Sequence, residues 1–203
     1  MTTKILIVDD HPIAQKGIVS VINTDTDLEI CGILGRANDV MPFVKTSAPD
    51  VIILGLNLPD GNGADILAEL IGAYDLTVII MTGEANAKNI RLCLNLGVRG
   101  IVCKCDKGQN VITAIHKALT GDLYLSPNIT KKMGDAEAPK IKLSSRQMAI
   151  LHFMGIGTTN KEICYRLKIA PPTVSFHTGE IRKKLNVSNN KKILPRAIEL
   201  DLI

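Results

Sequence analysis

Polar side chains follow three apolar runs in the first half of the chain, at the points where strands are expected to end. Asp9 and Asp10 come directly after one run, and Thr82 and Lys104 come after two others. If these runs form parallel strands of one sheet, their carboxyl ends share an edge and the side chains meet in one crevice. Carboxylates are ligands for Mg²⁺, and an ammonium group beside them could hold a phosphoryl group. Polar residues also end strands without any function, but four in this order favour a phosphoryl site.

The elements that would position these residues alternate between strands and helices. Short runs rich in β-branched residues predict strands at Lys4–Val8, Leu28–Ile33, Val51–Leu54, Thr77–Met81 and Gly100–Cys103. Amphipathic patterns predict helices near residues 12–23, 37–47, 64–71, 86–96 and 107–119. Because the strands are nearly continuous apolar runs, both faces of the sheet should be covered. Right-handed crossovers then leave an α/β fold with a doubly wound, five-stranded parallel sheet.

Several segments carry a resemblance to a known family: Ile5–Pro12, Pro49–Pro59 with Gly63, Ile80–Thr82 and Gly100–Lys104. Over about 120 residues the chain resembles the receiver domain of two-component response regulators. The resemblance implies a flavodoxin-like fold and phosphorylation of an aspartate at the end of the third strand. It also implies that the acid pair holds Mg²⁺, while Thr82 and Lys104 sense the phosphoryl group.

The aspartate that the family would phosphorylate is absent. Its position matches Gly55, which has no side chain and so no nucleophile, and phosphoryl transfer to this residue is chemically impossible. The loss leaves Asp9, Asp10 and the Asn57 carbonyl as metal ligands, so we expect weak Mg²⁺ binding at most and no other cofactor. Asp60 is a poor substitute acceptor because it would project from a loop. We therefore predict a degenerate receiver that is regulated independently of aspartyl phosphorylation.

Five cysteines lie mostly within apolar segments, and we expect them to be reduced core thiols. Cys103 and Cys105 flank Lys104 and project to the same side of a strand, which suggests a redox pair. With a rise of about 3.3 Å per residue, their Cα atoms should lie roughly 6.5 to 7 Å apart, which strains a direct disulfide. Core packing is therefore predicted for both. No metal site is expected from the scattered histidines, which are His11, His116, His152 and His177.

Positive charge gathers in the C-terminal part of the chain. Residues 1–125 carry 10 Lys and Arg against 14 Asp and Glu, whereas residues 126–203 carry 14 against 6. A small basic unit indicates a polyanion partner, because Lys and Arg neutralise phosphates; a solvated basic surface is the alternative. Three Phe and three Tyr, without Trp, are too few for a platform that stacks single-stranded nucleic acid. Two prolines and a glycine predict a linker over 123–140, between domains at 1–122 and 141–203.

Helical patterns without strands follow this linker. Ser144 or Ser145 is expected to cap a first helix that ends at Gly157, a second helix lies near Asn160–Leu167, and Pro171 opens a third. The inward face of the third helix carries Val174, Thr178, Ile181 and Leu185. Its outer face carries Ser175, Phe176, Gly179, Arg182 and Lys183. Two helices joined by a short turn, with a basic outer face on the second, describe a helix-turn-helix that inserts its second helix into the major groove of DNA.

A second resemblance is carried by Leu143, Arg146, Gly157, Asn160–Ile163, Leu167, Thr173, Val174, His177, Ile181, Lys184, Leu185, Val187 and Ser188. In register over about 45 residues, this stretch resembles the LuxR-type DNA-binding domain that ends NarL/FixJ-family regulators. The residues that the resemblance places at the phosphate backbone are Lys161, Thr173, His177, Lys183 and Lys184. Those that it places against base edges are Ser175, Phe176 and Gly179. Phosphate contacts set affinity and register, while base contacts set sequence preference.

Three residues of this domain are unusual for the predicted role. Phe176 could pack on a thymine methyl group or be tucked against its own domain. Gly179 inside a helix costs about 1 kcal/mol relative to alanine. Pro195 falls inside the last expected helix, where it removes a hydrogen bond and should kink the helix. The resemblance assigns dimerisation of the DNA-binding domains to that helix, and Pro195 counts against this role.

We predict a transcriptional regulator of the two-component response-regulator type, in the cytoplasm, that binds double-stranded DNA as a homodimer at an inverted repeat. Two alternatives stay open: an ordinary phosphorylation-controlled regulator disabled by an Asp-to-Gly change, and an interaction protein that pairs with other regulators without selecting DNA. A sensor kinase or another regulator is a further expected partner. No membrane partner is expected, because the longest apolar runs are about five residues. An enzyme is not expected, because the nucleophile position is empty and no other acid-base set is present.

Overall fold

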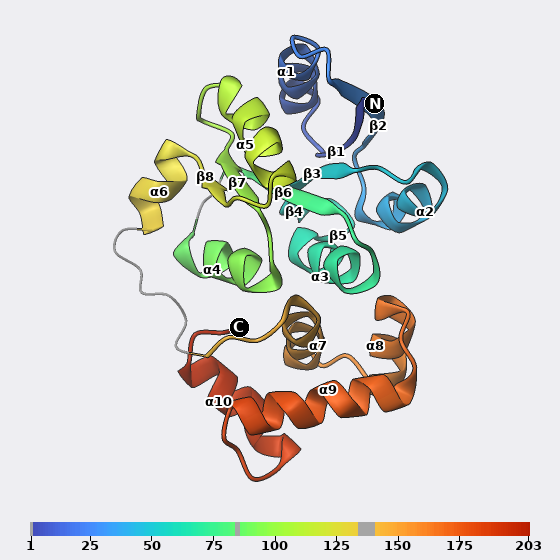
Figure 1. The fold of residues 1–203 in the computed structure, drawn as a ribbon, viewed down its shortest axis with the longest axis vertical. Coiled ribbons are helices and arrows are strands. Elements are labelled where there is room, and N and C mark those ends of the chain that lie inside the picture. Colours follow the sequence, from blue (N-terminus) through green and yellow to red (C-terminus); the bar gives the residue numbers. More distant parts are fainter. Residues whose placement is uncertain (1, 84–85, 134–140) are drawn as a thin grey trace.

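The computed structural model describes residues 2–83, 86–133 and 141–203, which form an α/β unit and a smaller helical unit (Figure 1). The α/β unit contains a sheet of six strands in the order β2-β1-β3-β6-β7-β8, in which all neighbours are parallel. The strands are β1 Thr3–Val8, β2 Leu28–Leu34, β3 Val51–Gly55, β6 Thr77–Thr82, β7 Gly100–Cys103 and β8 Tyr124–Leu125. A separate antiparallel hairpin is formed by β4 Asn57–Leu58 and β5 Gly61–Asn62.

Helices cover both faces of the sheet. They are α1 Pro12–Ile22, α2 Ala37–Ser47, α3 Gly63–Ala73, α4 Ala87–Leu96 and α5 Gln109–Leu119. Along β1, Ile5 and Ile7 pack in the core under α1 and α5, while Leu6 and Val8 pack in the core under α2, α3 and α4. This alternation between two cores explains why the strands are continuous apolar runs. The doubly wound α/β fold is confirmed, and every predicted strand and helix of this unit is present with its ends within two residues.

A sixth strand and a further helix lie where the sequence predicts the start of a linker. Tyr124–Leu125 form β8, and Pro127–Met133 form α6. The backbone N–H of Ser126 donates to Ile101 O at 3.0 Å and helps to add β8 to the edge of the sheet. The linker prediction was wrong for this part, because the strand depends on hydrogen bonds to its neighbour β7 and not on a pattern of its own. Residues 134–140, the rest of the predicted linker, lie outside the described residues.

The smaller unit is built from short helices that begin at side-chain caps. They are α7 Ser145–Gly155, α8 Asn160–Leu167, α9 Pro171–Lys184, the 3-10 helix η1 Asn190–Lys192 and α10 Ile193–Glu199. Ser144 forms a capping box with Gln147 at the start of α7, and Thr159 forms one with Glu162 at the start of α8. The predicted helix-turn-helix is therefore present as α8 and α9. None of the helices in the described residues is long and apolar enough to span a membrane.

Pro195 does not sit in a helix interior, contrary to the prediction. α10 begins at Ile193, so the proline is its third residue, and the residues before it form η1. The first N–H groups of a helix have no partner within it, so a proline at this position removes no helical hydrogen bond. The argument against α10 as a contact between DNA-binding domains therefore no longer holds.

Gly179 and Gly157 provide a matched test of helix stability in the smaller unit. Gly179 lies inside α9, and apart from the adjacent backbone of its own helix and its two chain neighbours, no heavy atom of the described residues lies within 4 Å of the position an added Cβ would take. Gly157 lies after α7 with φ of +81°, a conformation that L side chains rarely adopt. We expect Gly179→Ala to raise the free energy of unfolding by about 1 kcal/mol and Gly157→Ala to lower it by about 1 kcal/mol. Urea unfolding followed by circular dichroism measures both; shifts of the same sign would contradict this assignment.

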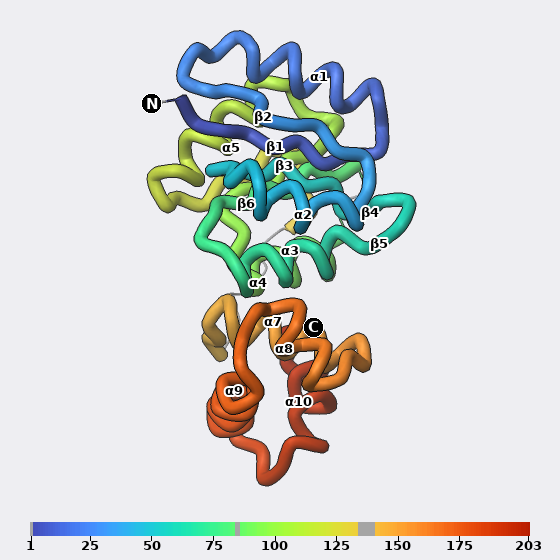
Figure 2. Tube along the Cα trace, turned by 90° about the vertical axis from the view of Figure 1, so that its right-hand side faces the viewer, coloured from blue at the N-terminus to red at the C-terminus, as the bar shows by residue number. Residues whose placement is uncertain are grey.

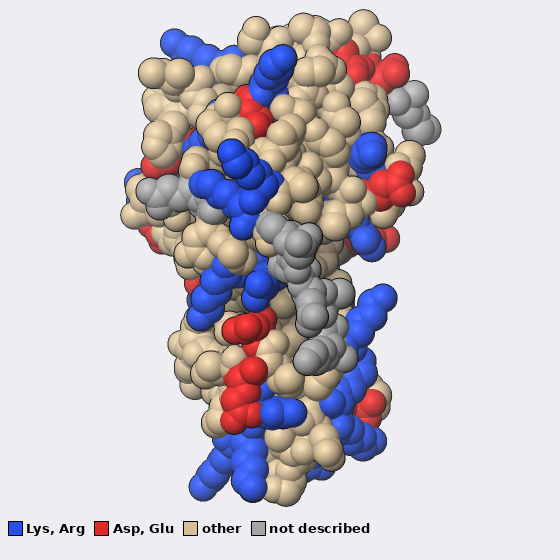
Figure 3. All heavy atoms as spheres, turned by 90° about the vertical axis from the view of Figure 1, so that its left-hand side faces the viewer, with Lys and Arg blue, Asp and Glu red and all other residues tan. Residues whose placement is uncertain are grey.

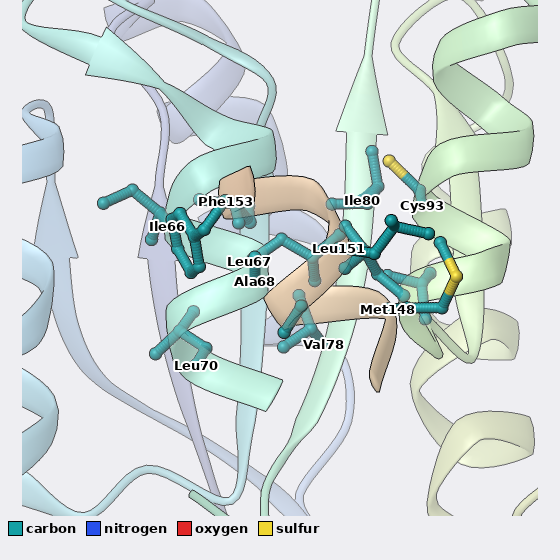
Figure 4. Packing of buried hydrophobic residues seen from close by; sticks show 14 of the residues in the cluster. Ile66, Leu67, Ala68, Leu70, Val78, Ile80, Cys93, Met148, Leu151 and Phe153 are labelled. Carbon is teal, nitrogen blue, oxygen red and sulfur yellow. The ribbon is translucent and has the colours of Figure 1, made fainter. Parts of the chain in front are cut away.

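The two units share one apolar core. α7 packs on α3 and α4, and α8 packs on α3. Figure 4 shows Leu151 of α7 close to Leu67 of α3 and Met148 of α7 on the side of Cys93 in α4, and all four belong to one buried cluster. Figures 1 and 2 place α9 on the side of the smaller unit that faces away from the sheet. Docking through α7 and α8 therefore leaves α9 uncovered.

Candidate phosphoryl pocket and nucleic-acid interface

Two of the polar residues that follow the strands line a cavity at the carboxyl edge of the sheet, and the acid pair lies beside them. Asp9 and Asp10 follow β1, Thr82 ends β6 and Lys104 follows β7. Thr82 and Lys104 line the cavity, which has a volume of about 450 Å³, and the backbone N–H of Lys104 donates to Thr82 O at 2.8 Å. The Lys104 ammonium lies 2.6 Å from Asp9 Oδ2, and Asp9 is only 2% exposed. The lysine that lines the pocket is thus paired directly with a buried carboxylate.

Gly55 ends β3 next to this ion pair and is buried. A Cβ built on Gly55 would lie 3.3 Å from both Asp9 Oδ2 and Val8 O, which is tighter than ordinary van der Waals contact. The Asp9 carboxylate therefore takes up part of the room that an acceptor side chain would need. At the end of β3 the chain offers neither a nucleophile nor a third carboxylate.

His11 joins the acid pair, although the spacing of the four histidines in the sequence predicted no metal site. Its Nδ1 lies 2.5 Å from Asp10 Oδ1 and 3.3 Å from Asp9 Oδ1, and the ligand atoms of the three residues lie within 4.8 Å of one another. The direct Asp-Asp-His order in the sequence was the available signal. Mg²⁺ needs near-octahedral oxygen coordination, but here Asp9 is paired with Lys104 and Asp10 with His11. These donors fit Mg²⁺ poorly, and a weak site at most stays a prediction.

Asp60 has a structural role outside the pocket. Its carboxylate accepts hydrogen bonds from the backbone N–H groups of Ala37 at 2.7 Å and Asn38 at 3.1 Å, at the start of α2. The Arg36 guanidinium lies 3.6 Å from the same carboxylate. Asp60 therefore satisfies free N–H groups of a helix N-terminus.

Cys103 and Cys105 form a disulfide, so the prediction of reduced thiols was wrong for both, and the prediction of core packing holds for Cys103 but not for the exposed Cys105. β7 ends at Cys103, and the chain turns through Lys104, with Asp106 N–H donating to Cys103 O at 3.0 Å. The turn brings the two Cα atoms to 5.2 Å, well below the separation expected in an extended strand. This distance is within the usual range for a disulfide. The remaining cysteines, Cys31, Cys93 and Cys164, are free.

The outer face of α9 is open to solvent. Phe176 is 64% exposed, with its ring edge-on to that of His177, so it is not tucked into its own domain. Ser175 and Lys183 are also exposed, and Thr173, Gly179 and Arg182 are partly exposed. The predicted inward face is confirmed, because its four residues are buried: Val174, Thr178, Ile181 and Leu185. Figure 3 shows Lys and Arg side chains along both edges of the smaller unit.

The basic residues expected at DNA phosphates differ in their surroundings. Lys161, at the start of α8, is exposed. Lys183 is exposed but forms an ion pair with Glu180 at 2.8 Å on its own helix. The Lys184 ammonium donates to Gln147 Oε1 at 2.9 Å and to a backbone oxygen before α7 at 3.1 Å. Lys184 therefore links α9 to α7 within the domain, and its contact with phosphate stays a prediction.

His177 has an environment that favours its neutral form. Burial lowers the pKa of this histidine, and the positive charge of Arg146 acts in the same direction. Its Nδ1 is buried and has no hydrogen-bond partner among the described residues. At neutral pH the ring can therefore orient or donate to a phosphate without adding a full charge.

Polar contacts between the two units were missed by the sequence analysis. His152 Nε2 lies 2.7 Å from Asp65 Oδ1, and Arg166 Nη1 lies 2.5 Å from Glu69 Oε1. Burial raises the pKa of Glu69, and the charge of Arg166 opposes this shift. One signal was present in the sequence: the run from Met148 to Phe153 is almost wholly apolar, and a helix that is apolar on all sides needs a second partner.

Comparisons with known proteins match both units. The family model for the response regulator receiver domain matches residues 5–116, and the model for bacterial regulatory proteins of the luxR family matches residues 142–196. The chain is 28% identical over 205 residues to the DNA-binding transcriptional activator DevR/DosR of Mycobacterium tuberculosis, across 97% of this chain and 94% of that protein. It is 26% identical over 195 residues to the transcriptional regulatory protein UhpA of Escherichia coli, across 96% and 97% of the two chains.

A solved structure of the response regulator RcsB in complex with DNA has a similar fold. The TM-score is 0.64, and the match covers 98% of this chain and 100% of that chain. The sequence identity is 20%, so this likeness supports the fold and no more.

Proposed function

The chain belongs to the response regulators that join a receiver domain to a DNA-binding domain of the luxR family, and we propose that its receiver controls DNA binding without taking up a phosphoryl group. The chain is a DNA-binding two-component response regulator of the LuxR type. The proposal concerns its control, which would come from a partner, a ligand or the abundance of the protein. The proposed control does not involve a sensor kinase that phosphorylates the end of β3.

The observation that carries the proposal is Gly55 at the end of β3. Asp9 Oδ2 lies 3.3 Å from the position of a Cβ at Gly55 and 2.6 Å from the Lys104 ammonium, while Asp9 Oδ1 accepts a hydrogen bond from the backbone N–H of His11 at 2.9 Å. In the receiver family the lysine would bind a phosphoryl group, whereas here it already has an anionic partner. Phosphate transfer to this site would need both a nucleophile and the release of Lys104.

We further propose that the chain binds an inverted repeat in double-stranded DNA as a homodimer. The exposed outer face of α9 and the excess of Lys and Arg in residues 126–203 support DNA as the partner. DevR/DosR is named as a DNA-binding activator, and RcsB dimers have been seen bound to DNA. The absence of a charged donor at Ser175 and Gly179 favours the alternative of an interaction protein, because fewer groups can bind guanine.

Fluorescence anisotropy with genomic fragments, over a range of salt concentrations, tests both proposals. We expect selective binding whose affinity falls steeply with salt, and no change after incubation with acetyl phosphate and Mg²⁺. Binding without sequence selection would support the interaction protein instead. Acid-labile phosphate on the chain together with tighter binding would contradict the proposed control, because it would require an acceptor other than residue 55.

A further inference from the structure

We propose that Cys103 and Cys105 form a reversible thiol–disulfide site whose redox state sets the position of Lys104 in the receiver pocket. The disulfide closes a small ring in the chain, and Lys104 is the residue inside that ring. The thiol chemistry does not depend on the proposed function. The idea that this redox state regulates the receiver in place of phosphorylation does rest on the proposed function.

The two cysteines differ in access to solvent in the way that thiol exchange requires. Cys105 is exposed, whereas Cys103 is 1% exposed and ends β7. An external thiol or disulfide can reach Cys105, and Cys103 is shielded but close enough to resolve the intermediate. In contrast, burial raises the pKa of Cys93 to about 12, so this thiol stays protonated and inert.

The disulfide is connected to the pocket through the backbone and side chain of Lys104. The lysine N–H donates to Thr82 O at 2.8 Å, and its ammonium lies 2.6 Å from Asp9 Oδ2. Closing the ring fixes the turn from which the lysine side chain extends. Opening the ring frees this turn, so the ammonium can leave Asp9. The Asp9 carboxylate then loses its lysine partner, and the positive charge of Lys104 takes a new position in the pocket.

A second connection leads from the disulfide towards the end of the α/β unit. The backbone N–H of Cys103 donates to Ser126 Oγ at 3.0 Å, and Ser126 Oγ donates to Asp106 Oδ2 at 2.5 Å. Asp106 also accepts from the side chain of Asn128 in α6 at 2.6 Å. The same turn therefore holds β7, the segment after β8 and the start of α6. A change in this turn would be transmitted to the segment that precedes the DNA-binding domain.

The chemical partner that fits this arrangement is a low-molecular-weight thiol and its disulfide, such as glutathione. The Cys105 thiolate attacks the small disulfide, forms a mixed disulfide and releases one thiol. The Cys103 thiolate then attacks the Cys105 sulfur and releases the second thiol. The two cysteines lose two protons and two electrons, and the small disulfide is reduced to two thiols. Excess thiol reverses both steps.

Thiol counting in the full chain tests the chemistry. The protein is equilibrated in glutathione buffers of set ratio, quenched with acid, unfolded in urea at neutral pH with excess maleimide so that buried thiols are also labelled, and weighed by mass spectrometry. We expect five labelled cysteines in the reduced form and three in the oxidised form, with Cys103 and Cys105 protected. Cys105→Ser should give no such protected pair, whereas the matched control Cys31→Ser should keep it. A stable glutathione adduct, or five free thiols in oxidised buffer, would refute the site.

The position of Lys104 is tested separately in the same samples. The acylation rate of its amine by a water-soluble ester, mapped by peptide mass spectrometry, should be higher in the reduced protein. Cys105→Ser should show the higher rate in both buffers, because it cannot close the ring. Equal Lys104 rates in the reduced and oxidised protein would refute the link to the pocket. Phosphate uptake from acetyl phosphate would refute the proposed function without affecting the thiol count, so the two failures are distinguishable.

Discussion

Gly55→Asp will produce a chain that takes up phosphate from acetyl phosphate in the presence of Mg²⁺, whereas the unchanged chain will take up none. The new carboxylate supplies the nucleophile and a third carboxylate for the cation. Its Cβ would lie 3.3 Å from Asp9 Oδ2 and Val8 O, so the Asp9 carboxylate and the Val8 carbonyl must each move by a few tenths of an ångström. Lys104 can then turn from Asp9 to the new group, and Thr82 already lines the same cavity.

Radiolabelled acetyl phosphate and acid treatment of the product measure this uptake. Gly55→Asn is the matched control, because it has nearly the same size but no nucleophile. Asp60→Asn in the Gly55→Asp chain tests the remaining candidate acceptor, and the hydrogen bonds of Asp60 to α2 predict that uptake stays the same. Acid-labile phosphate on the unchanged chain would contradict the proposed function. A folded Gly55→Asp chain that stays unlabelled would show that the loss extends beyond the acceptor.

The strands and helices were predicted accurately where the run of apolar residues in a segment follows directly from the burial of that segment. Val51–Leu54 is buried on both faces of the sheet, so its apolar run is visible without knowledge of its neighbours. The helices α7 and α8 have complete capping boxes, and α9 opens with Pro171. Such local signals mark the ends of helices directly. The site residues Asp9, Thr82 and Lys104 were likewise visible because strands of a parallel sheet end at a common edge.

The features that were missed depend on partners distant in the sequence or on a turn. β8 has two residues and is held by hydrogen bonds to β7, and the disulfide forms because the chain turns directly after Cys103. The docking of α7 on α3 depends on the relative position of two units, which hydrophobic periodicity does not report. Its polar contacts, such as that between His152 and Asp65, join residues far apart in the chain. The position of the Asp9 carboxylate beside Gly55 is also a tertiary feature.

Lys161→Ala will weaken binding to all DNA sequences by a similar factor, whereas Phe176→Ala will weaken binding to the preferred site alone. Lys161 is exposed at the start of α8, where the family resemblance places a phosphate contact. Its loss should reduce the slope of log affinity against log salt by about 1. Phe176 carries no charge and is 64% exposed on α9, so its loss should leave that slope unchanged. The preference for the specific site should fall by roughly 1 kcal/mol.

Lys16→Ala is the matched control, because it removes the same charge from an exposed position on α1, in the receiver domain. Anisotropy titrations with the preferred site and with an unrelated duplex, each at several salt concentrations, separate the two effects. If Lys161→Ala and Lys16→Ala change the salt slope equally, Lys161 does not contact the backbone. If Phe176→Ala lowers affinity for both duplexes alike, the ring does not read a base. Because docking through α7 leaves α9 uncovered, these effects should appear in the full chain and do not require removal of the receiver domain.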